Sequence, residues 1–338
     1  MHLQKVGIVV MFLLCVFMGS QYGYKKYDQL SRKNTEKEDG WIHKILEDTK
    51  KEGWINEDVH IETRKLEGDF IGDEALDQIW ILQGKHKKET LLALYENKHN
   101  AYQYVSCMEI MGELKAIQPM KMKGIQKDLL VIEEYMNQLL GSFEETTWIK
   151  VYDWRTKKVL PVLTLIEEYH AYWNELWDGK KPKKESRWLQ MAQKSYIQWE
   201  NDFYPIVHVV SHQNFSASKD RNQIEMPSED NFQVEKTREI KREYYWNPNW
   251  NAFILGEGID QKTGEKVAIL EDLSDNPFTL VGYEEEMYRI KRASGQMEEV
   301  PKNEIISNKM KKDVQVSLNK NKAASSKMKN CLAFYLIT

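Results

Sequence analysis

The sequence predicts a mainly β fold built from short antiparallel strands, together with one or two helices and an N-terminal transmembrane or signal segment. Short runs of strand-forming residues recur at intervals of about ten residues and are separated by turn residues, a pattern typical of sandwiches, barrels and propellers. With 41% hydrophobic residues and 11 tryptophans, the chain has enough apolar side chains for a core, because each buried Trp covers a large area. These two observations predict the fold class, and the apolar start of the chain predicts the membrane segment.

Residues 1–24 are expected to form a signal anchor or a signal peptide. After Lys5, no charged residue occurs from Val6 to Tyr24, and about 19 uncharged residues are just enough to span a bilayer. A cleaved signal needs small residues before the cut, and Met18 is bulky at the nearest candidate position. An uncleaved anchor that inserts residues 6–24 into the membrane is therefore favoured over a cleaved signal.

The basic residues beside this segment bear on its orientation. One lysine precedes the segment, whereas Lys25, Lys26, Arg32 and Lys33 follow it, so the positive-inside rule taken strictly keeps the following domain in the cytoplasm. Residues 25–40 are polar and charged and are expected to form a tether. A family resemblance described below implies the opposite, extracytoplasmic orientation, which we adopt as the expectation.

The first predicted elements are one helix and a series of strands. A short helix is predicted over Trp41–Lys51, where Trp41, Ile45 and Leu46 share one helical face. The β-rich globular domain is expected to extend over residues 41–300. Apolar or strand-forming runs predict strands at Ile79–Leu82, Leu91–Tyr95, Tyr102–Val105, Leu129–Ile132, Trp148–Tyr152 and Val159–Leu160.

Helical spacing interrupts the strands in the middle of the chain. Trp188, Ala192, Ser195 and Trp199 recur at intervals of three and four residues. Side chains at this spacing share one face of a helix, which predicts a second helix over Glu185–Glu200.

Polar segments set the remaining boundaries. After a strand at Phe203–Val210, Ser, Asp, Asn and Glu dominate residues 211–243, which predicts a long loop or insertion. A hairpin turn is predicted at Asp260–Gly264, because glycine readily adopts positive φ. Residues 301–338 are rich in Lys and Asn and are expected to be disordered. Strands are predicted between these segments at Ala252–Leu255, Val267–Leu270, Phe278–Tyr283 and Met287–Ile290.

One acidic loop has the composition of a metal site. Asp69, Asp73 and Asp77 fall at positions 1, 5 and 9 of the segment that leads into the apolar run Ile79–Leu82. Calcium prefers several oxygen ligands from one tight loop, so these three aspartates are the candidate metal ligands and calcium is the candidate cofactor. In the alternative interpretation, Asp69 and Asp73 shape a turn through hydrogen bonds between their side chains and the backbone.

This loop-then-strand element resembles the FG-GAP repeats of integrin-type β-propellers, in which an Asp-rich loop precedes an apolar strand. The sequence departs from the repeat at Ile71 and Glu74, which replace a ligand and a glycine. Fainter similarities to the repeat occur at Lys123–Val131 and Asn201–Val207. The resemblance implies an incomplete β-propeller outside the cytoplasm that presents loops to a partner, and it does not imply catalysis.

No residue is assigned a catalytic role, and no cofactor other than calcium is expected. His208 and His212 have the spacing of a zinc helix, but the glutamate that a metalloprotease needs is absent and the surrounding residues are strand-like. The net charge of −4 gives no reason to expect a nucleic-acid partner. We therefore expect a non-catalytic, membrane-anchored binding or scaffolding protein whose partner is a protein or a polysaccharide.

A carbohydrate-active hydrolase at the cell surface is the alternative function. Glutamate pairs are abundant, for example at residues 133–134, and a glycosidase uses two carboxylates. Tyr244, Tyr245, Trp246 and Trp250 form an aromatic stretch that can stack on sugar rings. This alternative requires exposed aromatic side chains along a cleft in which two carboxylates face each other.

Overall fold

The computed structural model describes most of the chain between residues 40 and 307. The described ranges are 40–57, 61–84, 89–99, 101–138, 143–155, 158–177, 186–200, 203–221, 225–282 and 286–307. The expected anchor, nearly all of the expected tether and the tail beyond Ser307 lie outside the described residues. Within these ranges, no helix has the length and the apolar character that a membrane span requires.

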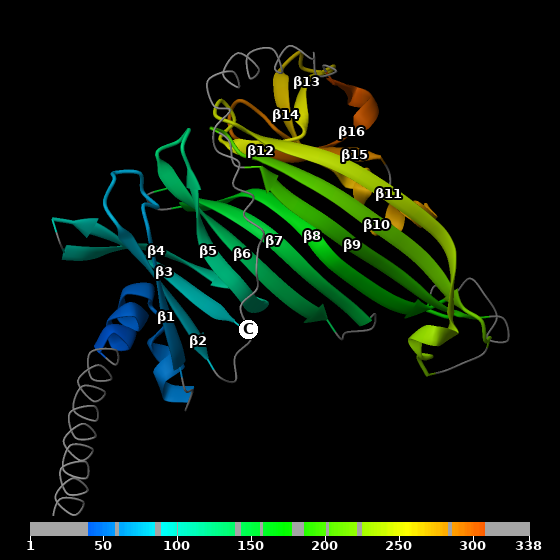
Figure 1. Cartoon of the computed structure of the whole chain (residues 1–338), viewed down its shortest axis with the longest axis horizontal. Coiled ribbons are helices and arrows are strands. Elements are labelled where there is room, and N and C mark those ends of the chain that lie inside the picture. The colour runs from blue at the N-terminus through cyan, green and yellow to red at the C-terminus, as the bar shows by residue number, and fades with distance from the viewer. Residues whose placement is uncertain are drawn as a thin grey trace, which may run out of the picture. The chain divides into compact units, whose positions relative to one another are not determined.

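The described chain is mainly β, as predicted, and its strands form three antiparallel sheets of four, eight and five strands. One α-helix covers residues 40–49. In the first two sheets, the strand order follows the chain order, so that each strand pairs with the next one along the chain (Figure 1).

The strands have the following bounds. Sheet A contains β1 (Ile61–Gly68), β2 (Asp77–Gly84), β3 (Thr90–Lys98) and β4 (Ala101–Ile110). Sheet B contains β5 (Glu113–Met122), β6 (Lys127–Gln138), β7 (Phe143–Arg155), β8 (Lys158–Asn174), β9 (Trp188–Glu200), β10 (Ile206–Ser218), β11 (Phe232–Asn247) and β12 (Ala252–Ile254). Sheet C contains β13 (Gly256–Asp260), β14 (Lys266–Asp272), β15 (Met287–Lys291), β16 (Met297–Pro301) and β17 (Ile305–Ser307).

Short 3-10 helices join several of these strands: η1 (Glu52–Glu57), η3 (Glu229–Asn231), η4 (Leu273–Asp275), η5 (Pro277–Val281) and η6 (Lys302–Glu304). The chain divides into two compact units. The first unit contains Met1–Lys121, Gln126–Met136 and Val151–Pro161, and the second unit contains Met122–Ile125, Asn137–Lys150 and Val162–Thr338. Helix 40–49 and sheet A therefore belong to the first unit, and β9 to β17 belong to the second.

Sheet A is covered on both faces, which explains why its central strands are apolar at consecutive positions. On one face, Leu82 and Leu91 pack against Ile45 and Leu46 of helix 40–49. On the other face, the sheet packs against residues of β6 and β7, including Trp154, which is only 1% exposed. The helix predicted at the start of the domain is thereby confirmed.

The strands β8 to β11 of the second unit are buried on one face. Buried and more exposed positions alternate along β9 and along the first half of β10, as expected for a sheet with only one covered face. On the covered face, Met191 and Phe215 lie in an apolar cluster that also contacts Phe278 and Leu280 of η5. The opposite face presents mainly polar side chains.

Three predicted elements are wrong. The helix predicted over Glu185–Glu200 is strand β9, because pairing with β8 on one edge and β10 on the other outweighs the helical spacing. The polar segment 211–243 contains most of β10 and β11, whose polar residues lie largely on the less covered face. The strand predicted over Phe278–Tyr283 is the 3-10 helix η5, which begins after the capping residue Asn276 and ends at Gly282 with φ 81°.

Two further expectations need correction. The strands of sheet B are not short, since β8 has 17 residues and β11 has 16, and eight strands in one sheet are not the four-stranded blades of a propeller. Disorder is wrong for residues 301–307, which end β16 and form η6 and β17. The remaining strand predictions are confirmed, and so is the turn at Asp260–Gly264, where Gly264 has φ 70°.

Arg238 of β11 fixes the segment of η4 and η5 to the covered face of sheet B. Its Nε donates to Gln213 Oε1 at 2.7 Å. Its Nη1 donates to the carbonyl of Ser274 and to Thr279 Oγ1, both at 3.0 Å, and its Nη2 donates to the carbonyl of Asn276 at 3.0 Å. The guanidinium group thus joins two strands of sheet B to a connection that is more than 30 residues away in the chain.

Replacing Arg238 with Met is expected to lower the free energy of unfolding by about 2 kcal/mol, because several acceptors lose their donor. Urea denaturation followed by tryptophan fluorescence measures the change. Lys241→Met is the matched control, since Lys241 lies on the same strand with a side chain that is 71% exposed and such residues contribute little. Equal losses in the two variants would contradict the role assigned to Arg238.

Sheet C is a meander in which the first strand, β13, also pairs with the last, β17. Arg292, which follows β15, holds one end of this sheet. Its Nη2 donates to Asp260 Oδ2 at 2.6 Å and its Nη1 donates to Glu265 Oε2 at 2.9 Å. The bond from Arg292, together with one from the backbone N–H of Lys262, lowers the pKa of Asp260 to about 2.

Asp260 therefore gives the fold a specific sensitivity to acid. Its folded-state pKa of about 2 is depressed, so the ionised carboxylate stabilises the fold above its unfolded pKa, near 3.9, and the contribution is lost as the pH falls toward 2. The difference in melting temperature between the parent protein and Asp260→Asn is expected to shrink between pH 5 and pH 2. A difference that stays constant over that range would argue against this linkage.

Candidate functional site

The aspartate loop between β1 and β2 is held by hydrogen bonds from its own backbone. Asp69 Oδ1 accepts from the N–H groups of Gly72 at 2.7 Å and Asp73 at 3.2 Å, and Asp69 Oδ2 accepts from the N–H of Glu74 at 3.1 Å. Asp73 Oδ1 accepts from the N–H of Ala75 at 3.0 Å. Gly72 and Glu74 have positive φ values of 91° and 67°, which is how the chain turns back tightly enough for one carboxylate to reach three N–H groups.

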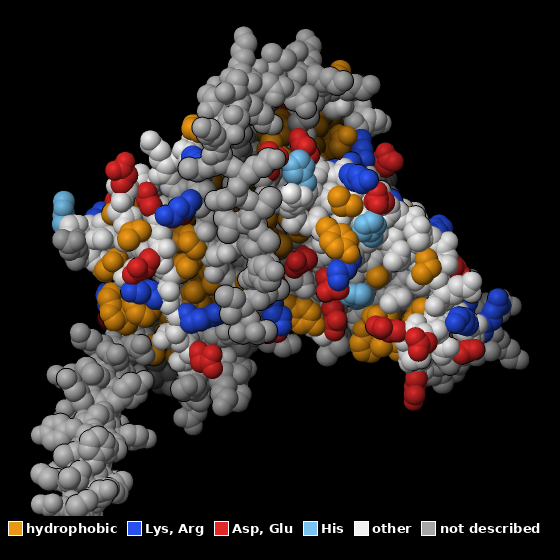
Figure 2. All heavy atoms as spheres, in the orientation of Figure 1, with side chains coloured by type: hydrophobic (Ala, Val, Ile, Leu, Met, Phe, Trp, Pro, Cys, Tyr) orange, Lys and Arg blue, Asp and Glu red, His pale blue; other side chains and the backbone are white. Residues whose placement is uncertain are grey.

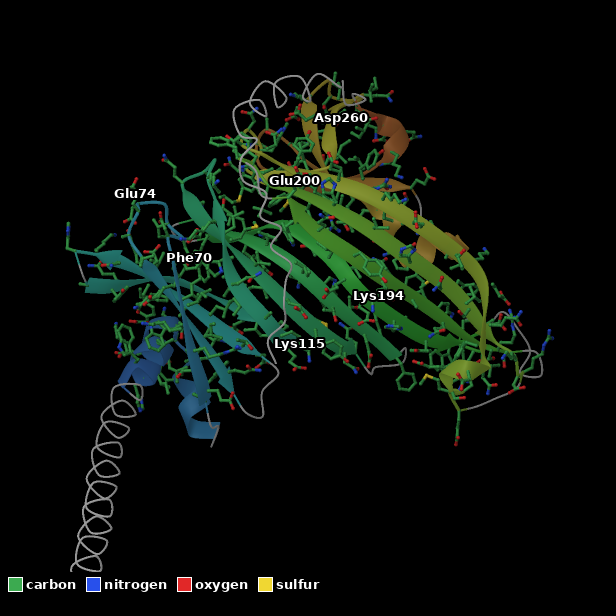
Figure 3. The ribbon with its side chains drawn as sticks, in the orientation of Figure 1. Phe70, Glu74, Lys115, Lys194, Glu200 and Asp260 are labelled. Atoms are coloured by element: carbon green, nitrogen blue, oxygen red, sulfur yellow. The ribbon has the colours of Figure 1, made fainter. Side chains whose placement is uncertain are left out.

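Asp77, the third candidate ligand, is fully buried at the start of β2. Its Oδ2 accepts from the N–H groups of Phe70 and Ile71, both at 3.0 Å, and its Oδ1 accepts from the N–H of Asn97 at 3.2 Å. Burial raises the pKa of Asp77, and the three backbone donors oppose that rise. Figure 3 labels Phe70 and Glu74 of this loop, and Phe70 is buried in the core of the first unit.

The hydrogen bonds of this loop run from backbone N–H groups to aspartate side chains, as in the alternative interpretation of the loop as a turn. Each of the three carboxylates is engaged by backbone N–H groups rather than pointed with the others at a common centre. Among the described residues, no group of three or more His, Cys, Asp or Glu side chains is arranged to hold a metal ion. Calcium binding by Asp69, Asp73 and Asp77 stays a prediction.

The two fainter FG-GAP-like segments occupy equivalent places in the topology. Strands β1–β4, β5–β8 and β9–β12 are three successive groups of four, and each segment covers the connection between the first two strands of its group. The two fainter segments extend into β6 and β10. Within the first unit, Asp69 N–H donates to Asp128 Oδ2 at 3.0 Å and Asp128 N–H donates to the Asp69 carbonyl at 2.6 Å. Within the second unit, Gly124 N–H donates to the Phe203 carbonyl at 3.0 Å. The last two groups are not separate blades, because β8 and β9 pair within one sheet.

The aromatic stretch that motivated the hydrolase alternative is mostly buried. Tyr244, Trp246 and Trp250 are 6%, 3% and 9% exposed. Trp246 packs edge-to-face on Phe253, with ring centroids 5.4 Å apart. These rings fill the core, so they do not form the exposed stacking platform that a sugar-cleaving site requires.

The exposed face of β8 to β11 is the candidate functional site. Three histidines lie on it, and each is within ion-pair distance of a glutamate of the same face. Figure 2 shows histidine, acidic and basic side chains interspersed over these strands. We call this surface the histidine face; it comprises His170, His208 and His212, Glu168, Glu200, Glu239 and Glu243, Lys194 and Lys241, and Tyr196.

Strand register sets the order of charges on the histidine face. Glu168 of β8 lies opposite Lys194 of β9, Lys194 lies opposite His212 of β10, and His212 lies opposite Glu239 of β11. One row across four strands therefore reads acid, base, histidine, acid. Figure 3 marks Lys194 and Glu200 along β9 of this sheet.

His208 lies between two carboxylates. Its Nε2 is 3.3 Å from Glu200 Oε2, and its Nδ1 is 3.4 Å from Glu243 Oε2. His212 Nδ1 is 3.6 Å from Glu239 Oε2, and His170 Nε2 is 3.5 Å from Glu168 Oε1. With neutral histidines, four glutamates and two lysines give the histidine face a net charge of −2.

Tyr196 supplies an exposed aromatic ring in this polar setting. It is 61% exposed and contacts the His212 ring edge-to-face, with ring centroids 5.8 Å apart. An exposed aromatic ring surrounded by hydrogen-bonding groups is typical of binding surfaces, because it offers contact area at little conformational cost. The histidine face therefore has the chemistry of a recognition surface.

Sequence reasoning missed this face. The strand-like surroundings predicted for His208 and His212 are confirmed by β10, but Lys194, Tyr196 and Glu200 fall in the segment predicted to be a helix. The strand signal in Trp188–Glu200 is confined to Leu189–Met191 and Ile197–Glu200, where polar and apolar residues alternate with a period of two. Glu239 and Glu243, which pair with His212 and His208, lie in the segment 211–243 that was predicted to be a loop.

Comparisons with known proteins identify no relative of this chain. No protein-family model matches this chain, and neither a curated protein nor a solved structure matches it.

The aspartate loop makes a prediction that separates its two interpretations. Asp77→Ala is expected to lower the free energy of unfolding by about 3 kcal/mol, because one buried and two part-buried N–H groups lose their acceptor, whereas Asp73→Ala is expected to cost about 0.5–1 kcal/mol. Urea denaturation in chelator and in millimolar calcium measures both. A calcium-dependent stabilisation that Asp73→Ala abolishes would instead establish the calcium site.

Proposed function

We propose that this protein is a non-catalytic, membrane-anchored binding or scaffolding protein whose folded units lie on the extracytoplasmic side. The apolar residues 6–24 supply the anchor. The observation that carries the binding role is the histidine face, in which an exposed tyrosine stands among paired glutamates and histidines on four adjacent strands.

Rigidity supports recognition by this face. Its strands β9 and β10 are hydrogen-bonded on both edges, and their other face packs into an apolar cluster. Side chains on such strands are held in place before a partner arrives, which reduces the entropy cost of binding. The partner is a protein or a polysaccharide, since the mixed charges of the face do not form the basic surface that nucleic acid requires.

The FG-GAP resemblance is retained as a proposal for the first group of strands. β1 to β4 form a four-stranded antiparallel meander, and the aspartate loop precedes its apolar strand β2. The proposal is limited to sheet A, because the eight strands of sheet B form one sheet and not separate four-stranded blades. Tyr244, Trp246 and Trp250 are buried, so they do not support the alternative of a carbohydrate-active hydrolase.

Placement outside the cytoplasm is tested by adding a protease to intact cells. We expect the folded units to be digested while a cytoplasmic marker protein stays intact. Protection that persists until the cells are lysed would place the units in the cytoplasm, as the positive-inside count favours.

The binding role is tested by a photoreactive phenylalanine analogue in place of Tyr196 in the full chain in cells. We expect one discrete cross-linked species from this position, and loss of that species when Glu243→Lys is added. The analogue at Leu76, which is 56% exposed in the first unit, is the control. Absence of cross-links at position 196, or the same pattern from both positions, would contradict recognition by the histidine face.

A further inference from the structure

The histidine face has negative charge that its own residues do not neutralise. Glu200 and Glu243 converge on the single imidazole of His208, at 3.3 and 3.4 Å. One imidazole carries at most one positive charge, so at least one of the two carboxylates remains unbalanced. Within the described part of the chain, no lysine or arginine lies within 4.0 Å of either carboxylate.

Both carboxylates are accessible to a cation from outside the sheet. The Glu200 and Glu243 side chains are 52% and 51% exposed. Glu168, on the same face, is 49% exposed and lies within ion-pair distance of His170 only, among the described residues. An ammonium group placed here gains Coulomb energy without being stripped of most of its water, which is the favourable case for a half-exposed ion pair.

The sequence contains one segment with the opposite charge. Residues 308–338 hold seven lysines and one aspartate, a net charge of +6. They follow directly after Ser307 of β17, which belongs to the same unit as the histidine face. We infer that this lysine-rich segment binds the histidine face of its own chain, with lysine ammonium groups at Glu200, Glu243 and Glu168.

Covalent linkage makes this contact favourable even when each ion pair is individually small. A segment of this length extends over distances on the order of 100 Å, so reach does not limit the contact. Covalent attachment to the same chain corresponds to an effective concentration of about a millimolar. This contact within the chain does not depend on the proposed membrane placement.

Carbodiimide cross-linking of the full chain tests the contact directly, because the reagent joins a lysine amine to a carboxylate only when the two are in contact. We expect intramolecular cross-links from Lys309–Lys329 to Glu200, Glu243 or Glu168, mapped by mass spectrometry on the monomeric species. The yield is expected to fall about fivefold in 1 M NaCl, where the Debye length is about 3 Å. Cross-links spread evenly over all exposed carboxylates, or found only in dimers, would overturn the inference.

Charge reversal supplies an independent readout. Trypsin cleaves after lysine, and a bound segment is cut more slowly than a free one. In the double variant Glu200→Lys and Glu243→Lys, cleavage within residues 308–330 at low salt is expected to be several-fold faster than in the parent protein. The matched control, Glu225→Lys with Glu229→Lys, makes the same charge change in the β10–β11 connection and is expected to leave the rate unchanged. Equal rates in all three proteins would also overturn the inference.

Discussion

Antiparallel pairing on both edges of β9 decides which side chains of the second unit meet solvent. Successive residues of a strand point to opposite faces, so the register that buries Met191 exposes Lys194 and Tyr196 further along the same strand. A slip of one residue would reverse every side chain and place polar groups against η5. The apolar cluster therefore specifies the histidine face, although none of its members lies on it.

Charged groups serve two different purposes in the second unit. Arg238 lies between strands and a connecting segment, and its donors meet fixed acceptors at 2.7 to 3.0 Å. Such satisfied polar contacts in a partly covered site hold one arrangement of the chain. On the histidine face, by contrast, the pairs are about half-exposed and contribute little to stability.

The aspartate loop shows why a ligand pattern and a turn pattern look alike in sequence. Both require oxygen atoms that point inward from a tightly curled chain. Backbone N–H groups of the loop itself satisfy Asp69, and the N–H of Asn97, contributed by the distant strand β3, helps to satisfy Asp77. The other two N–H groups that bond to Asp77 belong to Phe70 and Ile71 of the loop itself.

By itself, the sequence determined the mainly β class, the helix at residues 40–49 and most strand positions, because these follow from local runs of apolar residues and turn formers. Tertiary structure alone decided that Trp188–Glu200 is a strand, that the polar segment after Ser211 belongs to a sheet, and that strands β5 to β12 form one sheet. It also brought Glu168, Lys194, His212 and Glu239 into one row. These features depend on hydrogen bonds between strands, and a pattern within one segment carries no record of which strand will lie beside it.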